Sequence, residues 1–318
     1  MPAVSVVVPS YNHAPYLDRR ICSILDQTFQ DFDLLVIDDA STDDSPQVLS
    51  RYANHPRVTI QRQPHNSGSP FVQWNRGVRA TSAPLVWIAE SDDECEPRFL
   101  ERMVGCLDAH PACGLAYSQS WAMDAAGVTD GTLRRWTDSV DATHWCTDYV
   151  NTGRDEIAQY LAVSNTIPNA SAVVFRREVF EKVGGAPDGM RLAGDWMTWV
   201  RMLLVSDVAF VAEPLNRHRS HDATVRTAFA DAPRWWQESL DVWRHVYDRL
   251  ELPDTTRTRI ADIVREVIVR LLPRAAACPQ LVRSLYAFGC QLHPRFGRSL
   301  ARMLVTRGLG ALARHDRR

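Results

Sequence analysis

The sequence predicts an α/β fold, in which a mostly parallel β-sheet is flanked by helices and followed by a small C-terminal helical region. In the first half, short β-branched runs alternate with amphipathic stretches of helical length, which is the pattern of βαβ units. Beyond Pro233, only apolar stripes with helical spacing remain. With 318 residues, 45% of them hydrophobic, the chain can bury the core of one large or two modest domains.

The elements of the first part follow from the period of the apolar residues. We expect strands at 4–8, 33–38, 57–61, 85–89 and 114–118, and helices between them at about 15–27, 44–54, 69–80 and 97–109. Residues 119–150 interrupt this alternation. A helix near 153–163, a strand at 171–176, a helix beginning at Asp195 and a strand at 208–212 then follow.

Two apolar stripes define the C-terminal helices. One runs along 260–272 and ends at Pro273, and the next runs from Leu281 to Leu292. We place a domain boundary near residue 230, so the two parts are 1–230 and 231–318. These helices can pack on the first domain, form a homodimer, or contact an anionic membrane. We favour packing; the arginines that would contact a membrane are Arg295, Arg298, Arg302 and Arg307.

Composition argues against several classes of protein. The net charge is −2, but residues 251–318 hold thirteen Arg against five Asp or Glu, a balance of +8. This basic segment lacks the interleaved aromatic residues and the helix-turn-helix spacing of nucleic-acid-binding proteins, so we expect no nucleic-acid partner. The chain contains neither GxGxxG nor GxxxxGK[ST], so a nucleotide would be bound in another way.

Cysteine usage and hydropathy predict the compartment. The seven Cys form no C-x-x-C pair and are odd in number, which is a poor disulfide framework. The apolar run Val4–Val8 is too short for a signal peptide, and no later segment approaches 18 apolar residues. We therefore expect a cytoplasmic protein that is soluble or peripheral at the cytoplasmic face of the inner membrane.

Carboxylates cluster where two predicted strands end. Asp38 and Asp39 end the second strand, and Asp92 and Asp93 follow the fourth, within the run LVWIAESDDECEP at 85–97. Ligands of parallel sheets bind beyond the carboxyl ends of the strands, so we expect both pairs at one crevice. Mg²⁺ or Mn²⁺ would relieve the repulsion and leave positions for phosphate oxygens. The alternative is that these are solvated turn and N-cap residues.

The outer carboxylates of that run, Glu94 and Glu96, need another explanation. We expect water and the N-terminus of the following helix to stabilise their charge.

At the end of the first strand, Tyr11 can stack on a nucleobase and Asn12 can donate to it. An ordinary turn with a packed Tyr explains these two residues equally well.

Taken in chain order, the motifs resemble the family 2 glycosyltransferases, which are inverting enzymes of the GT-A (Rossmann-like) fold, here of the bacterial glycan or O-antigen type. The resemblance covers roughly residues 3–226, with a donor half at about 1–118 and an acceptor half at about 119–230. The motifs are VSVVVPSYN, LLVIDDASTD, NSGSPFVQWNRGV, IAESDD, IPNASAVVFRR, AGDWMTWVRML and EPLNRHRSHDATVR.

The resemblance implies a role for each matching residue at a donor site. Pro9 and Tyr11 match the nucleobase wall, Asp39 the carboxylate that accepts from the base, and Asn66, Gly68 and Asn75 the loop and helix that shape the site. Asp92 is placed towards the ribose and Asp93 towards the metal. His221 is a second metal ligand or a surface or packing residue, and Arg219 is a candidate for the diphosphate. The sequence departs from the family at Glu90, where Asp is common, and at Trp74, where Arg is common.

Asp195 matches the catalytic base of the family. The implied reaction is direct displacement at the anomeric carbon, with Asp195 taking the proton of an acceptor hydroxyl. A purely structural role as a helix N-cap is the alternative. The implied substrates are a nucleoside-diphosphate sugar and a glycan or lipid-linked glycan.

Other interpretations remain at this point. A sugar nucleotidyltransferase shares the layout, but its Gly-rich basic loop after the first strand is missing. A non-catalytic homologue that binds nucleotide-sugars is a further alternative. Three aromatic residues form an acceptor platform or are scattered packing residues: Trp121, Trp136 and Trp145.

Overall fold

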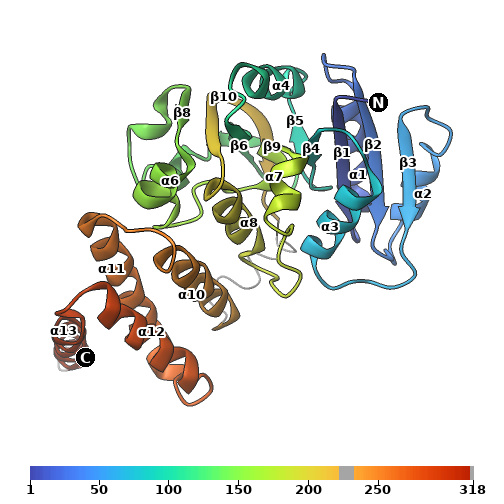
Figure 1. Cartoon of the computed structure of the whole chain (residues 1–318). Coiled ribbons are helices and arrows are strands. Elements are labelled where there is room, and N and C mark those ends of the chain that lie inside the picture. The colour runs from blue at the N-terminus through green and yellow to red at the C-terminus, as the bar shows by residue number, and fades with distance from the viewer. Residues whose placement is uncertain (222–232, 316–318) are drawn as a thin grey trace.

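The computed structural model describes residues 1–221 and 233–315, with side chains as far as Thr306 (Figure 1). The strands described there form one sheet in the order β3-β2-β1-β4-β9-β6-β10-β5, with β7 beside β6 and β8 beside β10. Their bounds are β1 (Val4–Ser10), β2 (Phe32–Asp38), β3 (Val58–Arg62), β4 (Leu85–Ile88), β5 (Glu94–Cys95), β6 (Cys113–Met123), β7 (Thr129–Thr132), β8 (Tyr149–Asn151), β9 (Val173–Arg176) and β10 (Asp207–Arg219).

The helices of the described residues lie on both faces of this sheet and at one end of it. They are α1 (Ala14–Leu25), α2 (Ser45–Ser50), α3 (Pro70–Ala80), α4 (Phe99–Ala109), α5 (Arg134–Thr137), α6 (Gly153–Glu156), α7 (Arg177–Lys182), α8 (Gly194–Leu203), α10 (Pro233–Tyr247), α11 (Asp254–Leu271), α12 (Pro279–Leu292) and α13 (Phe296–His315). A π-helical turn at Ile157–Leu161 continues α6. The predicted α/β class, with a C-terminal helical region, is confirmed.

The sheet is parallel from β3 to β4 and mixed beyond β4. Strands β3, β2, β1 and β4 pair in parallel, and β6 pairs in parallel with β10. Between these groups, β9 runs antiparallel to both β4 and β6. Strands β6 and β10 extend well beyond the predicted 114–118 and 208–212, because polar residues continue both strands after the apolar runs end.

Alternation along β1 shows how one strand serves both faces of the sheet. Val4, Val6 and Val8 are buried in the core that includes residues of α1 and α4. Val7 belongs to the opposite core, with residues of α3 and α8. Successive side chains of a strand point to opposite faces, so a wholly apolar strand indicates burial on both. Helix α3 can approach β1 closely because Gly77 lacks a side chain, and a Cβ there would lie 2.2 Å from Val7.

The C-terminal helices pack on the α8 side of the sheet. In Figure 1 these helices, orange to red, lie together below α8 and α6. Trp243 of α10 meets Trp196 of α8 edge to face with ring centroids 6.2 Å apart, and one apolar core includes residues of both regions. The favoured packing interpretation therefore agrees with the structure, and the predicted boundary near 230 lies outside the described residues.

The other two interpretations of these helices stay predictions. The side chains of Arg295, Arg298 and Arg302 are exposed, and that of Arg307 lies outside the described residues. Within the described chain, no helix combines the length and the hydropathy that a membrane span requires. All seven cysteines are free thiols.

Glu238 of α10 joins the C-terminal region to the loop before α8. Its carboxylate accepts hydrogen bonds from the backbone N–H groups of Arg191, Leu192 and Ala193 at 2.8 to 3.2 Å, and from Arg234 Nε at 2.9 Å. Burial would raise the pKa of Glu238, but these hydrogen bonds outweigh it and hold that pKa below its usual value. One ionised carboxylate thus fixes the backbone that leads into α8.

Replacing this carboxylate should destabilise the protein. We expect Glu238→Gln to lose about 1–3 kcal/mol of unfolding free energy, because an amide cannot accept from all these donors. The wild-type advantage should be full above about pH 5 and shrink as the pH falls below the usual Glu pKa of about 4.3. Urea denaturation measures this, with the exposed Glu251→Gln as the control; equal midpoints for both variants would contradict it.

Candidate active site

A cleft of about 820 Å³ opens beyond the carboxyl ends of β1, β2 and β4 and reaches the start of α8. The predicted residues that line it are Pro9, Tyr11, Asp39, Asn66, Gly68, Asp92, Asp93, Asp195 and Arg219. Asn12, Asn75 and His221 lie outside this lining. Segments far apart in the sequence therefore meet in one cavity, at the edge of the sheet where ligands of parallel sheets bind.

The loop after β1 presents one aromatic side chain and ties itself to the next loop. Tyr11 is 43% exposed and lines the cleft. Asn12 has a positive φ of 54°, which Asn tolerates better than most residues. Its N–H donates to Ser41 Oγ at 3.0 Å and its Oδ1 accepts from Thr42 N at 2.8 Å. Asn12 thus holds the two loops together, while Tyr11 remains available to a ligand.

Asp39 organises the loop that precedes α3. Its carboxylate accepts from the Ser67 N–H at 2.9 and 3.1 Å, from Ser67 Oγ at 2.7 Å and from Gln73 Nε2. Asn66 Oδ1 accepts from the Gly68 N–H at 2.7 Å, and Gly68 has a φ of 71°, which favours glycine. The carboxylate of Asp39 is therefore largely occupied by the protein itself.

The side chain of Asn75 forms hydrogen bonds within the protein. Its Nδ2 donates to Ala186 O at 2.8 Å and also to Asp188, and its Oδ1 accepts from Ala186 N at 2.9 Å. These contacts join α3 to the loop after α7. The geometry supports a positioning role for Asn75, behind the cleft, more than a direct donor contact.

The two departures from the family pattern contact each other. Trp74 Nε1 donates to Glu90 Oε1 at 2.9 Å, and both residues line the cleft. Burial and the nearby charge of Asp92 raise the pKa of Glu90 to about 8, against a smaller lowering by the Trp74 hydrogen bond. At neutral pH this position therefore carries a protonated acid that can donate a hydrogen bond.

Asp92 and Asp93 point to different partners. Asp92 Oδ2 and His221 Nε2 are 3.1 Å apart. Burial would raise the pKa of Asp92, but the His221 hydrogen bond and the nearby His13 and His218 lower it to about 2. Asp93 Oδ1 accepts from the Arg219 N–H at 2.8 Å and lies 3.4 Å from His218 Nδ1. Asp93 thus holds β10 and lies beside His218, whereas Asp92 lies beside His13 and His221.

The structure corrects the prediction of what stabilises the charges of Glu94 and Glu96. Glu96 accepts from Arg217 Nε at 2.8 Å, and Glu94 pairs with Arg219. Glu94 belongs to β5, which pairs with β10, and α4 begins only at Phe99. Arginines of β10, rather than the N-terminus of α4, therefore neutralise this end of the acidic run.

Arg219 is fully engaged by the protein. Its side chain is completely buried, and its guanidinium donates to Asp92 O at 2.7 Å, Asp124 O at 3.1 Å and Ala125 O at 3.2 Å, as well as to Glu94. The guanidinium also lies over the Tyr16 ring, 4.8 Å from its centroid. These contacts favour a structural role and argue against the predicted diphosphate contact.

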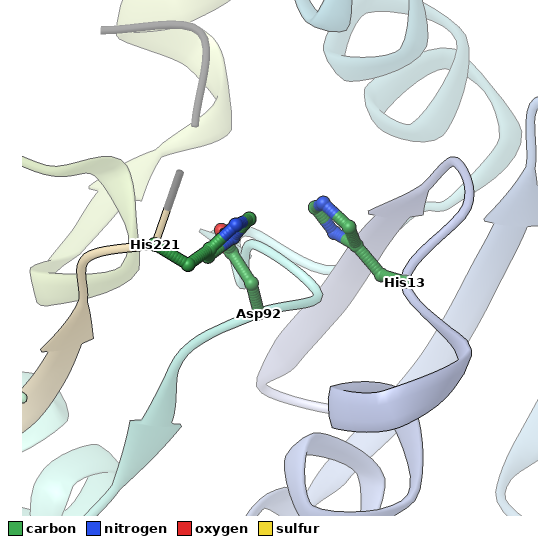
Figure 2. Close-up of side chains that lie close together, drawn as sticks. All are labelled: His13, Asp92 and His221. Atoms are coloured by element: carbon green, nitrogen blue, oxygen red, sulfur yellow. The ribbon is translucent and has the colours of Figure 1, made fainter. Parts of the chain in front are cut away.

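His13, Asp92 and His221 form a group that could hold a metal ion. One ligand atom from each lies within 4.8 Å of the other two, and Figure 2 shows the three side chains converging from the loops after β1, β4 and β10. His221 was predicted as a ligand. In this group Asp92 takes the place predicted for Asp93, because the Asp93 carboxylate is turned towards the β10 backbone.

Asp195 lies in the first turn of α8 and lines the cleft. Its Oδ2 accepts from Asn165 Nδ2 at 2.9 Å, and its Oδ1 from the Trp196 N–H at 2.7 Å. The Trp136 indole donates to Asn165 O at 2.9 Å. The positive end of the α8 dipole favours an ionised carboxylate here. Asn165 and Trp136 thus fix the orientation of Asp195.

Of the predicted aromatic platform, only Trp136 lines the cleft among the described residues. Trp145 is buried and donates to Tyr117 OH at 2.8 Å, so it is a packing residue, and Trp121 lies within β6. Sequence reasoning missed several residues at the cleft or beside it: His13, Asn165, Arg191 and Trp235. His13 directly follows the predicted Tyr11-Asn12 pair, which was the one available signal.

Comparison with known proteins shows which family this chain belongs to. The profile described as Glycosyl transferase family 2 matches residues 5–184. An uncharacterized glycosyltransferase of Nostoc sp. is 26% identical over 245 residues, which is 72% of this chain and 68% of that protein.

Two solved structures share the fold. TarS residues 1–349 of S. aureus, in complex with UDP-GlcNAc, has a TM-score of 0.67 and 17% identity over 92% of this chain and 82% of that chain. The mannosyltransferase PcManGT of Pyrobaculum calidifontis, in complex with GDP-Man and Mn²⁺, has a TM-score of 0.58 and 20% identity over 98% and 81%. The predicted GT-A fold is thereby confirmed.

Because the folded chain keeps Glu90 protonated, the free energy of unfolding should depend on pH in a characteristic way. The folded chain keeps this proton to about pH 8, whereas the unfolded chain releases it near pH 4.3. Wild-type stability relative to Glu90→Gln should therefore fall as the pH rises from about 5 to 8, then level off. Urea denaturation in chelator at pH 5.5, 7 and 8.5 measures this, with the exposed Glu178→Gln as control. A constant difference across this range would contradict the assignment.

Proposed function

Because the chain belongs to glycosyl transferase family 2, whose members use nucleotide-sugars, we propose that it is an inverting enzyme that moves a hexosyl group from a nucleoside-diphosphate sugar to a hydroxyl of a glycan or lipid-linked glycan. The observation that carries this proposal is the shared cleft. Asp195 opens onto the same cavity as the strand-end residues Pro9, Tyr11 and Asp92.

The strand-end side of the cleft suits the donor. The exposed ring of Tyr11 and the adjacent Pro9 can form a wall for a nucleobase. The polar loop that Asp39 holds in place, with Asn66 and Gly68, lies beside them. Bound UDP-GlcNAc in TarS and bound GDP-Man in PcManGT support a nucleoside-diphosphate sugar as the donor class.

The residues present also suit the divalent cation, Mg²⁺ or Mn²⁺, that we propose for donor binding. Asp92 and His221 would hold it, since their side chains lie close together and Asp92 lines the cleft, and the Mn²⁺ of PcManGT is consistent with this. When bound, such an ion supplies positive charge for the diphosphate that departs. Asp93 would support the site by holding the end of β10 in place.

Asp195 would act as the catalytic base. An ionised carboxylate at the N-terminus of α8 can take the proton of an acceptor hydroxyl as its oxygen attacks the anomeric carbon. Asn165 holds one carboxylate oxygen, which orients Asp195 for that transfer. Among the described residues, the other carboxylates of the cleft follow β2 or β4. A single carboxylate on the acceptor side agrees with inversion, because retention needs a second, nucleophilic one.

The acceptor would enter between α8 and the C-terminal helices. Trp136, 36% exposed, and Trp235 of α10 both line the cleft. Aromatic faces of this kind pack against the apolar faces of sugar rings. Their position near Asp195 supports a sugar-containing acceptor.

Donor binding should be detectable without any knowledge of the acceptor. We expect a UDP-, GDP- or dTDP-sugar to raise the melting temperature, and Mn²⁺ to increase that shift, because a ligand of the folded state stabilises it by mass action. Differential scanning fluorimetry with each donor, with Mn²⁺ and with chelator, measures this. No shift with any donor would argue against the proposal.

Substitution of the base should separate binding from chemistry. We expect Asp195→Asn to lower kcat by about 10²- to 10⁴-fold while donor affinity stays within about threefold, since Asp195 belongs to α8 and not to the strand-end loops proposed to bind the donor. Asn165→Ala should lower kcat by about tenfold with a smaller change in donor KM, because the base remains but loses its orientation. Asp130→Asn, at a highly exposed position, is the control. Wild-type transfer by Asp195→Asn would refute the assignment.

A further inference from the structure

We propose that His13 is a third protein ligand of the divalent cation, beside Asp92 and His221, and that this set makes the site prefer Mn²⁺ or Zn²⁺ to Mg²⁺. The inference rests on the proposed function for the purpose of the ion, although the ion can be measured by itself. It assigns a role to a cleft residue that the nucleotide and acceptor sites leave unexplained.

The three side chains are already close to the spacing that a metal ion requires. Their ligand atoms lie within 4.8 Å of one another, and two ligands on opposite sides of one ion are separated by roughly 4.2 Å, twice the usual metal–nitrogen distance of about 2.1 Å. A small side-chain rotation would close the difference. The three residues come from the ends of β1, β4 and β10, as Figure 2 shows, so a shared ion would join three loops.

The surroundings of His13 orient it as metal-binding histidines are oriented. A hydrogen bond of 2.7 Å joins His13 Nδ1 to Ser91 Oγ, which leaves Nε2 as the nitrogen for an ion. Ligating histidines usually donate through their second nitrogen in this way. The His13 and His221 rings stand nearly perpendicular, at 86°, with centroids 5.7 Å apart, and Tyr16 packs beside His221. These contacts hold each imidazole near the position it needs before an ion binds.

The chemistry of the ligands determines the preference. Mg²⁺ favours oxygen ligands and gives up its water reluctantly, whereas imidazole suits later divalent ions and Mn²⁺ accepts mixed ligands. Two imidazoles and one carboxylate leave positions in the coordination shell for diphosphate oxygens. Without His13, one imidazole and one carboxylate remain, and the difference between Mn²⁺ and Mg²⁺ should become smaller.

The test measures metal binding by the full chain without substrate. Isothermal titration with Mn²⁺, Zn²⁺ and Mg²⁺ is applied to wild type, His13→Asn and the exposed control His110→Asn. We expect His13→Asn to weaken Mn²⁺ and Zn²⁺ binding by about tenfold to a hundredfold, with less than about threefold change for Mg²⁺, for which an amide oxygen is an adequate ligand. Electron spin-echo spectroscopy of bound Mn²⁺ should show weaker imidazole nitrogen modulation in His13→Asn only.

The outcomes separate this inference from the proposed function. Equal Mn²⁺ affinity and equal nitrogen modulation in His13→Asn and wild type would overturn the inference, as would an equal loss for Mn²⁺ and Mg²⁺, which indicates a packing role for His13. UDP and GDP titrations in chelator report on the nucleotide site separately. Selective loss of Mn²⁺ binding without any nucleotide binding would support the inference and count against the proposed function. Melting curves in chelator verify that each variant is folded.

Discussion

The geometry of the candidate site depends on the burial of one positive charge, the guanidinium of Arg219. A buried charge costs several kcal/mol unless it is paired and hydrogen-bonded. Arg219 meets that requirement by donating to the loop after β4, to the turn at Asp124 and to Glu94. Its planar group directs donors to several loops at once, which an ammonium group cannot do. The spacing between Asp92 and the end of β10 follows from this arrangement.

Around that charge, each carboxylate of the cleft has a different environment. Glu90 is protonated beside an indole, Asp92 is ionised beside histidines, and Asp93 accepts from a backbone N–H. Asp195 has the N-terminus of a helix behind it. Separate environments allow acidic groups that would repel one another in water to share one cavity. The same principle explains why one fold can place a neutral acid and several ionised carboxylates within a single cleft.

Much of the fold could be predicted from the sequence, because the spacing of apolar residues along the chain indicates which positions are buried. Strands β1 to β4 were located to within a residue or two, whereas β5 was not predicted. The extensions of β6 and β10 were missed, since polar residues form them and only sheet pairing reveals that they are strands. At the site, the strand-end carboxylates were found by their position. The hydrogen bond between Trp74 and Glu90 joins residues 16 apart in sequence, and that between Asn165 and Asp195 joins residues 30 apart; no local pattern encodes either contact.

The contribution of α10 to the cleft determines what recombination within the gene would change. Trp235 lines the cavity, and three residues later Glu238 holds the backbone before α8. A gene segment that ends near the predicted boundary would therefore encode every strand of the described sheet but omit one wall of the cleft. Recombination at that point would exchange the residues that α10 contributes to the cleft while retaining those strands. The helical region is thus a unit whose exchange would alter one wall of the cleft and leave the strands of the sheet unchanged.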